Sequence, residues 1–278
     1  MKIKRTLVCD GGGMKGAFLA GAMAGLRDNG IDYSFFDNYI GTSAGACSIA
    51  YFLTNQIDEG LRIWSSGLMK DFIKWNSFKP QVDLNYLRRI LTEIEPLNLE
   101  VLKQRPQRAY VALANVKTNK TDYLLLNQKL DPIEILMASV AMPTYCPPKE
   151  LAGQFYYDGG LTSQPPLEFA DTLEQDEIWV ILNRPIGYRV TTLGWKMLSM
   201  GVKDKVARQF VAEKPKKINK ILATLESRKD LIIICPKQKL PVHWLTTGRE
   251  DILKTLELGK ESVKELLESR VNLIQNNP

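Results

Sequence analysis

Short apolar runs alternate along this chain with longer segments in which apolar side chains recur every three or four positions. The first pattern is typical of buried strands, and the second is typical of helices with one buried face. Strands are predicted over residues 4–9, 37–41, 108–116, 121–126, 155–157, 177–183 and 231–235, and helices over 17–28, 44–54, 57–72, 83–94, 132–139, about 190–225 and 249–273. This alternation predicts an α/β fold of three layers, α/β/α, with helices on both faces of a mostly parallel sheet.

Length and composition suit one globular domain. The chain has 278 residues, of which 45% are hydrophobic, and it contains no internal repeat or long linker. Chains of this size with alternating strands and helices commonly form one domain. We therefore expect a single domain over residues 1–278, with a motif-bearing part at about 4–185 and a helical, basic part at about 186–278.

The sequence also bears on compartment and cofactors. No run approaches the ~20 apolar residues that span a bilayer, and the apolar run at residues 6–9 is too short for a secretory signal. The cysteines lack the paired spacing of a metal site, so we interpret them as reduced thiols of a cytoplasmic protein: Cys9, Cys47, Cys146 and Cys235. We expect no metal, no calcium requirement and no cofactor.

The stretch Gly41–Gly45 (GTSAG) lies between a predicted strand and a predicted helix. This is the context of a Gly-x-Ser-x-Gly nucleophile elbow, which presents a serine on a tight turn. Gly41 and Gly45 would give the turn clearance, and the helix N-terminus would stabilise negative charge near Ser43. The alternative is a small-residue turn in which Ser43 only caps the helix.

A glycine-rich loop, Asp10–Gly16 (DGGGMKG), follows the first predicted strand and precedes a predicted helix. Consecutive glycines leave backbone N–H groups free to converge on an anion, as in an oxyanion hole. The candidate donors are Gly11, Gly12, Gly13 and Met14. Lys15 would add a positive charge beside them, or would simply be solvated.

The same loop fits a rival pattern. Gly11, Gly13 and Gly16 spell the dinucleotide fingerprint Gly-x-Gly-x-x-Gly. That fold requires an acidic residue at the end of the second strand to hold the ribose. Asp32 has a suitable spacing but precedes the second predicted strand, which runs directly into the elbow. A dinucleotide-binding, Rossmann-like protein therefore remains an alternative without its confirming residue.

A nucleophilic serine needs a base, and two candidates exist. His243 is the one histidine of the chain and follows the last predicted strand, as in a Ser-His-acid hydrolase, although it could equally pack beside Trp244. Asp158 ends the strand at 155–157 and precedes Gly159 and Gly160. A carboxylate is ionised at neutral pH and can accept a proton directly, so we favour Asp158.

These motifs resemble the patatin-like phospholipases, also called patatin-like lipolytic acyl hydrolases. Asp10–Gly16 is similar to the family's oxyanion loop with its basic residue, Gly41–Gly45 to its nucleophile elbow, and Asp158–Gly160 to the loop of its catalytic aspartate. Ala138–Pro143 is similar to the family's Ala-Ser-x-Ala-x-Pro segment. The helical pattern around residues 256–259 resembles the bacterial, single-domain branch of the family.

The resemblance implies a serine acyl hydrolase with a Ser43–Asp158 dyad and no catalytic histidine. Its substrates would be fatty-acyl esters of lipids, with phospholipids or lysophospholipids as the expected class. Two departures concern the surroundings of the site. Gln164-Pro165-Pro166 stands where the family often has Asn-x-Pro, and Asn115 stands where an aspartate is frequent. A catalytically silent lipid-binding protein is a further alternative.

The net charge of +6 is concentrated in residues 196–229, which hold ten Lys or Arg and three acidic residues, for a charge of +7. Val190, Leu193, Met197 and Met200 recur just before it at helical spacing. An apolar face followed by basic residues suits peripheral contact with an anionic membrane through residues 190–229. Otherwise the apolar face packs on the sheet and the lysines are solvated. Without aromatic interleaving or a known module, we expect no nucleic-acid binding.

Overall fold

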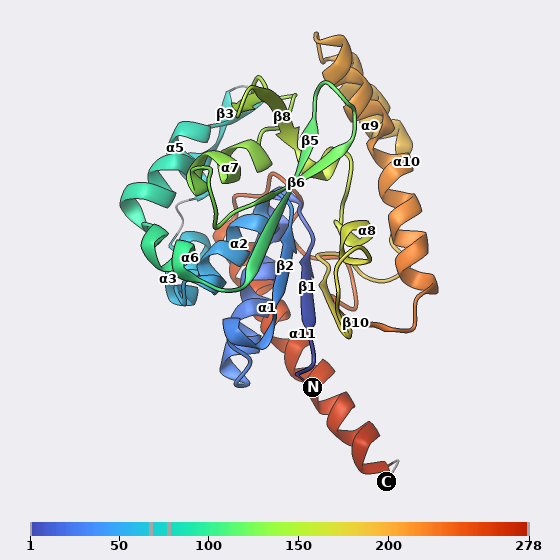
Figure 1. The fold of residues 1–278 in the computed structure, drawn as a ribbon. Helices are drawn as coiled ribbons and strands as arrows, with labels where there is room; N and C mark the ends of the chain where they lie inside the picture. The colour runs from blue at the N-terminus through green and yellow to red at the C-terminus, as the bar shows by residue number, and fades with distance from the viewer. Residues whose placement is uncertain (1, 67–68, 77–78, 277–278) are drawn as a thin grey trace.

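The computed structural model describes residues 2–66, 69–76 and 79–276. An eight-stranded sheet forms the middle of the molecule (Figure 1). Its strands follow the order β10 (Leu231–Ile234), β9 (Glu177–Ile181), β1 (Arg5–Cys9), β2 (Asn38–Gly41), β5 (Arg108–Asn115), β8 (Gln154–Asp158) and β7 (Lys149–Leu151), and β6 (Thr121–Leu125) pairs with β5 off this path. The first five run parallel to one another, whereas β6, β7 and β8 are antiparallel to their neighbours.

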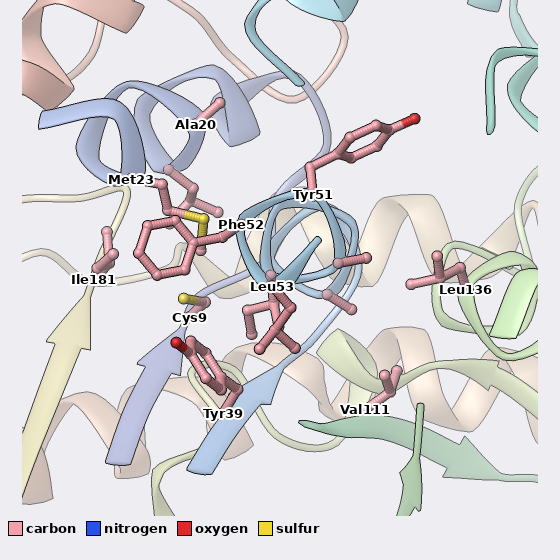
Figure 2. Packing of buried hydrophobic residues seen from close by; sticks show 14 of the residues in the cluster. Cys9, Ala20, Met23, Tyr39, Tyr51, Phe52, Leu53, Val111, Leu136 and Ile181 are labelled. Carbon is pink, nitrogen blue, oxygen red and sulfur yellow. The ribbon is translucent and has the colours of Figure 1, made fainter. Parts of the chain in front are cut away.

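The parallel strands are buried on both faces, and alternate side chains face opposite helical layers. Leu7 and Cys9 face the core formed with α1 (Gly16–Asp28), α2 (Ala44–Leu53) and α11 (Arg249–Asn276), part of which is drawn in Figure 2. Val8 faces the second core, formed with α8 (Leu167–Ala170) and α10 (Lys205–Ser227). The expected three-layer α/β/α fold with a mostly parallel sheet is confirmed.

The remaining helices lie in the connections between the strands. They are α3 (Ile57–Ser65), α4 (Met69–Phe72), α5 (Leu84–Arg89), α6 (Leu99–Gln104), α7 (Pro132–Ser139) and α9 (Thr192–Met200), with helical turns at Gly13–Lys15, Tyr33–Phe35 and Gly159–Leu161 and a wider π-helical turn at Ile90–Ile94. None of the helices in the described residues is both long enough and apolar enough to cross a membrane.

Predicted elements differ from the structure mainly between residues 57 and 94. The helical segment expected at 57–72 contains two helices, α3 and α4, and residues 67–68 lie outside the described residues. The helix expected at 83–94 ends as α5 at Arg89 and widens into the π-helical turn. A hairpin of β3 (Ile73–Asn76) and β4 (Lys79–Val82) was not predicted, because each strand is only four residues long.

The pairing of β5 determines where two of the predicted site residues lie. Gly41 at the end of β2 pairs with Val111, and Asp158 at the end of β8 pairs with Leu113. Both Val111 and Leu113 also pair with β6, which must therefore occupy the opposite edge of β5. β2 and β8 consequently share one edge of β5, and their carboxyl ends meet there.

Candidate active site

Ser43 lies on a strained turn between β2 and α2. Its φ angle is 53° and its side chain is buried, with 7% exposure. A positive φ is uncommon for a residue with a side chain, and such strain is concentrated at functional sites. The turn depends on its flanking glycines, because a Cβ atom at Gly41 would lie 2.8 Å from Ala46 N and one at Gly45 would clash with the Asp10 carbonyl oxygen. This is the geometry expected of a nucleophile elbow.

Asp158 faces the same cavity as Ser43 from the end of β8. Its carboxylate accepts a 2.7 Å hydrogen bond from Gly160 N, and Gly159 packs so closely on Ala112 that a Cβ atom would clash with the carbonyl oxygen there. Burial raises the pKa of Asp158 above its ordinary value, while the positive charge of Lys214, the Gly160 amide and the Ser43 hydroxyl lower it in part. A partly raised pKa suits a group that must accept and return a proton.

The glycine loop adopts backbone conformations that side chains would disfavour. Gly12 has φ 149° and Gly13 has φ 57°, and a Cβ atom at Gly13 would lie 2.5 Å from the Trp244 carbonyl oxygen. Two of the four expected oxyanion donors are already engaged, since Gly11 N donates to Asp10 Oδ1 at 2.8 Å and Met14 N donates to Trp244 O at 3.3 Å. The amides of Gly12 and Gly13 are therefore the better candidates.

Residues after β9 hold the glycine loop in place. Arg184 donates to both carboxylate oxygens of Asp10, from Nε to Oδ2 at 3.0 Å and from Nη2 to Oδ1 at 3.3 Å. Asn183 Nδ2 donates to the Gly11 carbonyl oxygen at 2.6 Å, and Gln164 Nε2 donates to the same oxygen. Gln164, which departs from the family pattern, thus makes a direct contact with the loop.

Lys15 and Gly16 continue from this loop into α1. Burial and the neighbouring charge of Arg184 lower the pKa of Lys15 to about 8, so this side chain is not the freely solvated lysine of the alternative interpretation. Its Nζ lies 5.4 Å from the centre of the Tyr188 ring. Gly16 permits close packing of α1 on α2, because a Cβ atom there would lie 2.6 Å from Ala44 Cβ.

A cavity of about 550 Å³ opens at Ser43. Its walls are mostly apolar and include Ala20, Met23, Phe52, Ile63, Leu87 and Leu91. The polar groups that line it include Lys15, Ser43, Asp158, Gln164, Arg184 and Lys214. An apolar cavity with a few convergent polar groups is the ordinary form of a small-molecule site. Within the described ranges, no three His, Cys, Asp or Glu side chains gather as metal ligands would.

The sequence did not indicate that Asn183, Arg184 or Lys214 belongs to the site. Asn183 and Arg184 follow β9, whose carboxyl end adjoins that of β1, so the strand order alone brings them to the glycine loop. Lys214 was counted only as one charge of a basic segment. Its side chain is 8% exposed, and its Nζ lies 4.6 Å from the centre of the Trp195 ring.

Two other residues singled out in the sequence have local roles. His243 is exposed and lies outside the cavity lining, and its Nδ1 accepts a hydrogen bond from Leu245 N at 3.2 Å. Asn115 stabilises the turn after β5, where its Oδ1 accepts from Lys117 N at 2.9 Å and its Nδ2 donates to Asp122 at 2.7 Å. The four cysteines are free thiols, and burial raises the pKa of Cys47 in the cavity wall to about 12.

The fold, the strained turn at Ser43 and the apolar cavity fit the class of protein that the motifs suggested. The family model of patatin-like phospholipases matches residues 7–171. The chain therefore belongs to the patatin-like phospholipase family. This confirms the family resemblance seen in the motifs.

Two similar proteins extend the comparison. The uncharacterized protein YjjU of Escherichia coli (strain K12) is 26% identical over 217 residues, which are 74% of this chain and 59% of YjjU. The chain thus spans under two thirds of that relative. The crystal structure of VipD from Legionella pneumophila matches with a TM-score of 0.53 and 12% identity, over 97% of this chain and 67% of that one. At this identity the likeness shows a shared fold.

The buried ion pair makes a testable contribution to stability. Arg184→Met leaves the Asp10 carboxylate, which is 0% exposed, without its guanidinium partner. We expect a loss of about 3–5 kcal/mol in the free energy of unfolding, measured by urea denaturation. Arg189→Met is the matched control, because Arg189 pairs with Glu226 at the surface, and such pairs contribute about 0–1 kcal/mol. Equal losses in the two variants would contradict this role.

Proposed function

We propose that this protein hydrolyses fatty-acyl esters of lipids with a Ser43–Asp158 dyad. One observation carries the proposal. β2 and β8 end side by side on one edge of β5, and Ser43 and Asp158 at those ends face one apolar cavity. The exposed His243 lies outside that cavity, which favours the aspartate as the base.

The reaction begins when the Asp158 carboxylate takes the proton of the Ser43 hydroxyl. Ser43 Oγ attacks the ester carbonyl carbon, and the amides of Gly12 and Gly13 donate hydrogen bonds to the oxyanion that forms. When the tetrahedral intermediate collapses, Asp158 returns the proton to the leaving alcohol and an acyl-enzyme remains. Asp158 then accepts a proton from a water molecule, which attacks the acyl carbonyl carbon. As the bond to Ser43 breaks, Asp158 gives this proton to Ser43 Oγ, and the fatty acid leaves.

The cavity supports a substrate with a long acyl chain. Apolar side chains from α1, α2, α3 and α5 line it, and contact with them removes the chain from water. Phospholipids and lysophospholipids combine such a chain with a polar alcohol portion. They are the substrate class that we propose.

Covalent labelling tests the nucleophile. A fluorophosphonate probe should label the wild type and fail to label Ser43→Ala, and in-gel fluorescence measures the label. Ser48→Ala is a matched control, because Ser48 lines the same cavity but donates its hydroxyl to the Ala44 carbonyl oxygen. Label on Ser43→Ala would exclude the proposed nucleophile. Asp158→Asn should slow labelling by about 10²–10⁴-fold, whereas His243→Ala should react as the wild type does.

The pH dependence of hydrolysis tests the base. Asp158 must be ionised to accept a proton, so activity on a neutral ester should fall as the pH drops through its pKa. Because burial raises that pKa, the acid limb should lie above the ordinary range of an aspartate. Lys214 lowers the same pKa, so Lys214→Met should move the limb to higher pH. Initial rates from pH 4 to pH 8 measure the position of the acid limb. An acid limb that does not shift in Lys214→Met would oppose Asp158 as the base.

The outer face of α9 supports peripheral docking on an anionic lipid surface. Leu193, Met197 and Met200 are 72%, 61% and 68% exposed, so this apolar face does not pack on the sheet. The opposite side of α9 contributes Trp195 and Leu198 to the cavity wall. Exposed basic residues accompany the apolar face on α9, in the segment that follows it and at the start of α10, namely Lys196, Lys203 and Lys205. Lipid entering from such a surface would reach the cavity directly.

Vesicle binding tests this docking face. Replacing Leu193, Met197 and Met200 together by Ser should weaken binding to phosphatidylglycerol-containing vesicles by at least about tenfold, because apolar area is lost from the interface. Co-sedimentation measures binding, and hydrolysis of a short soluble ester should stay unchanged. Val271→Ser is the control, because Val271 is also exposed but lies on α11. Unaltered vesicle binding of the triple variant would rule out this face.

A further inference from the structure

Lys214 is a buried lysine that the proposed dyad chemistry does not require. It lies on α10, beyond the residues that match the family model. One turn earlier on the same helix, Phe210 and Val211 pack in one cluster with Tyr157 and Leu161, which flank the Asp158 loop. Since residues three and four positions apart share a helix face, Lys214 is carried to the cavity beside Asp158.

The Lys214 ammonium is incompletely neutralised. Its electrostatic neighbours are Asp158, Arg184, Asp10 and Lys15, and within the described ranges no carboxylate oxygen comes within the 4.0 Å of an ion pair with its Nζ. The Trp195 ring supplies a cation–π contact. A buried charge without a hydrogen-bonded partner is costly, so a partner entering from the cavity would be stabilising.

The charges around this end of the cavity do not balance. Arg184 is neutralised by Asp10, with which it forms two hydrogen bonds. The carboxylate with the largest effect on Lys214 is then that of Asp158, whereas Lys15 has only that of Asp10, which Arg184 already neutralises. Burial and repulsion by nearby positive charges, including Lys239 near Lys15, lower the pKa of each lysine to about 8. An anion bound between them would relieve this repulsion.

Lys15 and Lys214 lie at the end of the cavity toward which the alcohol portion of an ester attacked at Ser43 would extend. Much of the apolar wall comes from α1, α2, α3 and α5, whereas α10 and α9 contribute Lys214 together with the apolar Ile218, Trp195 and Leu198. Figure 1 shows α3 and α5 across the sheet from α10. Ser43 follows a strand of the middle layer and so lies between the two ends. An ester attacked at Ser43 with its acyl chain in the apolar end would extend its alcohol portion toward Lys15 and Lys214.

We propose that Lys15 and Lys214 form an anion subsite that binds the phosphate of the alcohol portion of a lipid ester. The inference rests on the proposed function and makes it more specific, because it selects phosphate-bearing lipids over neutral acylglycerols. In a glycerophospholipid the phosphate lies only a few bonds from the ester oxygen that leaves, so both groups fit one cavity. Two ammonium groups can donate several hydrogen bonds to phosphate oxygens, and a phosphate monoester carries up to about two negative charges at neutral pH.

A matched pair of substrates tests the subsite. 1-Oleoylglycerol 3-phosphate and 1-oleoylglycerol share acyl chain and glycerol and differ only by the phosphate. Each is presented at the same mole fraction in neutral detergent micelles, at a pH where Asp158 is ionised in every variant. We expect Lys214→Met to raise KM for the phosphate ester by about 10- to 100-fold and to leave KM for the neutral ester within about twofold.

Three further variants define the effect. Lys214→Arg keeps the charge and should retain most of the preference for the phosphate ester, whereas Lys15→Met should lose it as Lys214→Met does. Lys216→Met is the matched control, because Lys216 is exposed on the same helix and should have no effect. If Lys214→Met raised KM equally for both esters, Lys214 would act only as a counter-ion of Asp158. If Lys216→Met also lost the preference for the phosphate ester, that preference would come from general attraction to the basic surface. Either result would overturn the subsite.

Binding without hydrolysis separates the subsite from the proposed function. An ether analogue, 1-O-octadecylglycerol 3-phosphate, should bind the wild type more tightly than 1-O-octadecylglycerol in calorimetry, and Lys214→Met should abolish the difference. If neither ester were hydrolysed and the probe did not label Ser43, the proposed function would be wrong. The difference in affinity between the two ether analogues would still support the subsite. Inorganic phosphate should compete weakly. Equal affinity for inorganic phosphate would assign the site to a free anion and overturn the lipid assignment.

Discussion

The shared edge of β5 is the constraint on which the candidate active site depends. A strand has two edges, and β6 fills one of them, so β2 and β8 must meet end to end along the other. Residues more than a hundred positions apart are thereby brought together by backbone pairing, before any side-chain contact is made. The antiparallel direction of β8 matters as much, because it makes Asp158 the last residue of its strand, facing the turn that follows Gly41.

The glycine loop is held by a different kind of interaction. Its amides can serve an incoming oxyanion only if its own carbonyl groups and charges are satisfied elsewhere. Arg184 and Asn183 supply those partners from the segment after β9, and Gln164 does so from the segment after Asp158. A buried ion pair is expensive to form and more expensive to leave half-made, so it favours one arrangement of the loop. Preorganised donors of this kind need little rearrangement as charge develops.

The sequence predicted those parts of the site whose residues are adjacent along the chain. Ser43, Asp158 and the glycines stand in motifs whose residue types are dictated by tight backbone, and these were recognised without coordinates. The five parallel strands were recognised because buried strands are continuously apolar, whereas the three-residue β7 (Lys149–Leu151) was not predicted. Arg184 and Lys214 carried no such signal, because their roles arise from strand order and helix packing. The β3–β4 hairpin was missed although Ile73–Asn76 alternates apolar and polar residues, since four positions fit a helix equally well.

The charge along the chain does not distinguish Lys214 from the exposed lysines around it. Ten basic residues between 196 and 229 suggested one basic surface, yet α10 is amphipathic and presents Lys216 and Lys220 to solvent while Lys214 is buried. The exposed lysines keep their hydration and act at long range, whereas Lys214 has exchanged water for Trp195 and the field of Asp158. In the functions that we propose, one helix would have two separate roles, attraction of an anionic surface outside and selection of an anionic group inside. Only burial distinguishes the two.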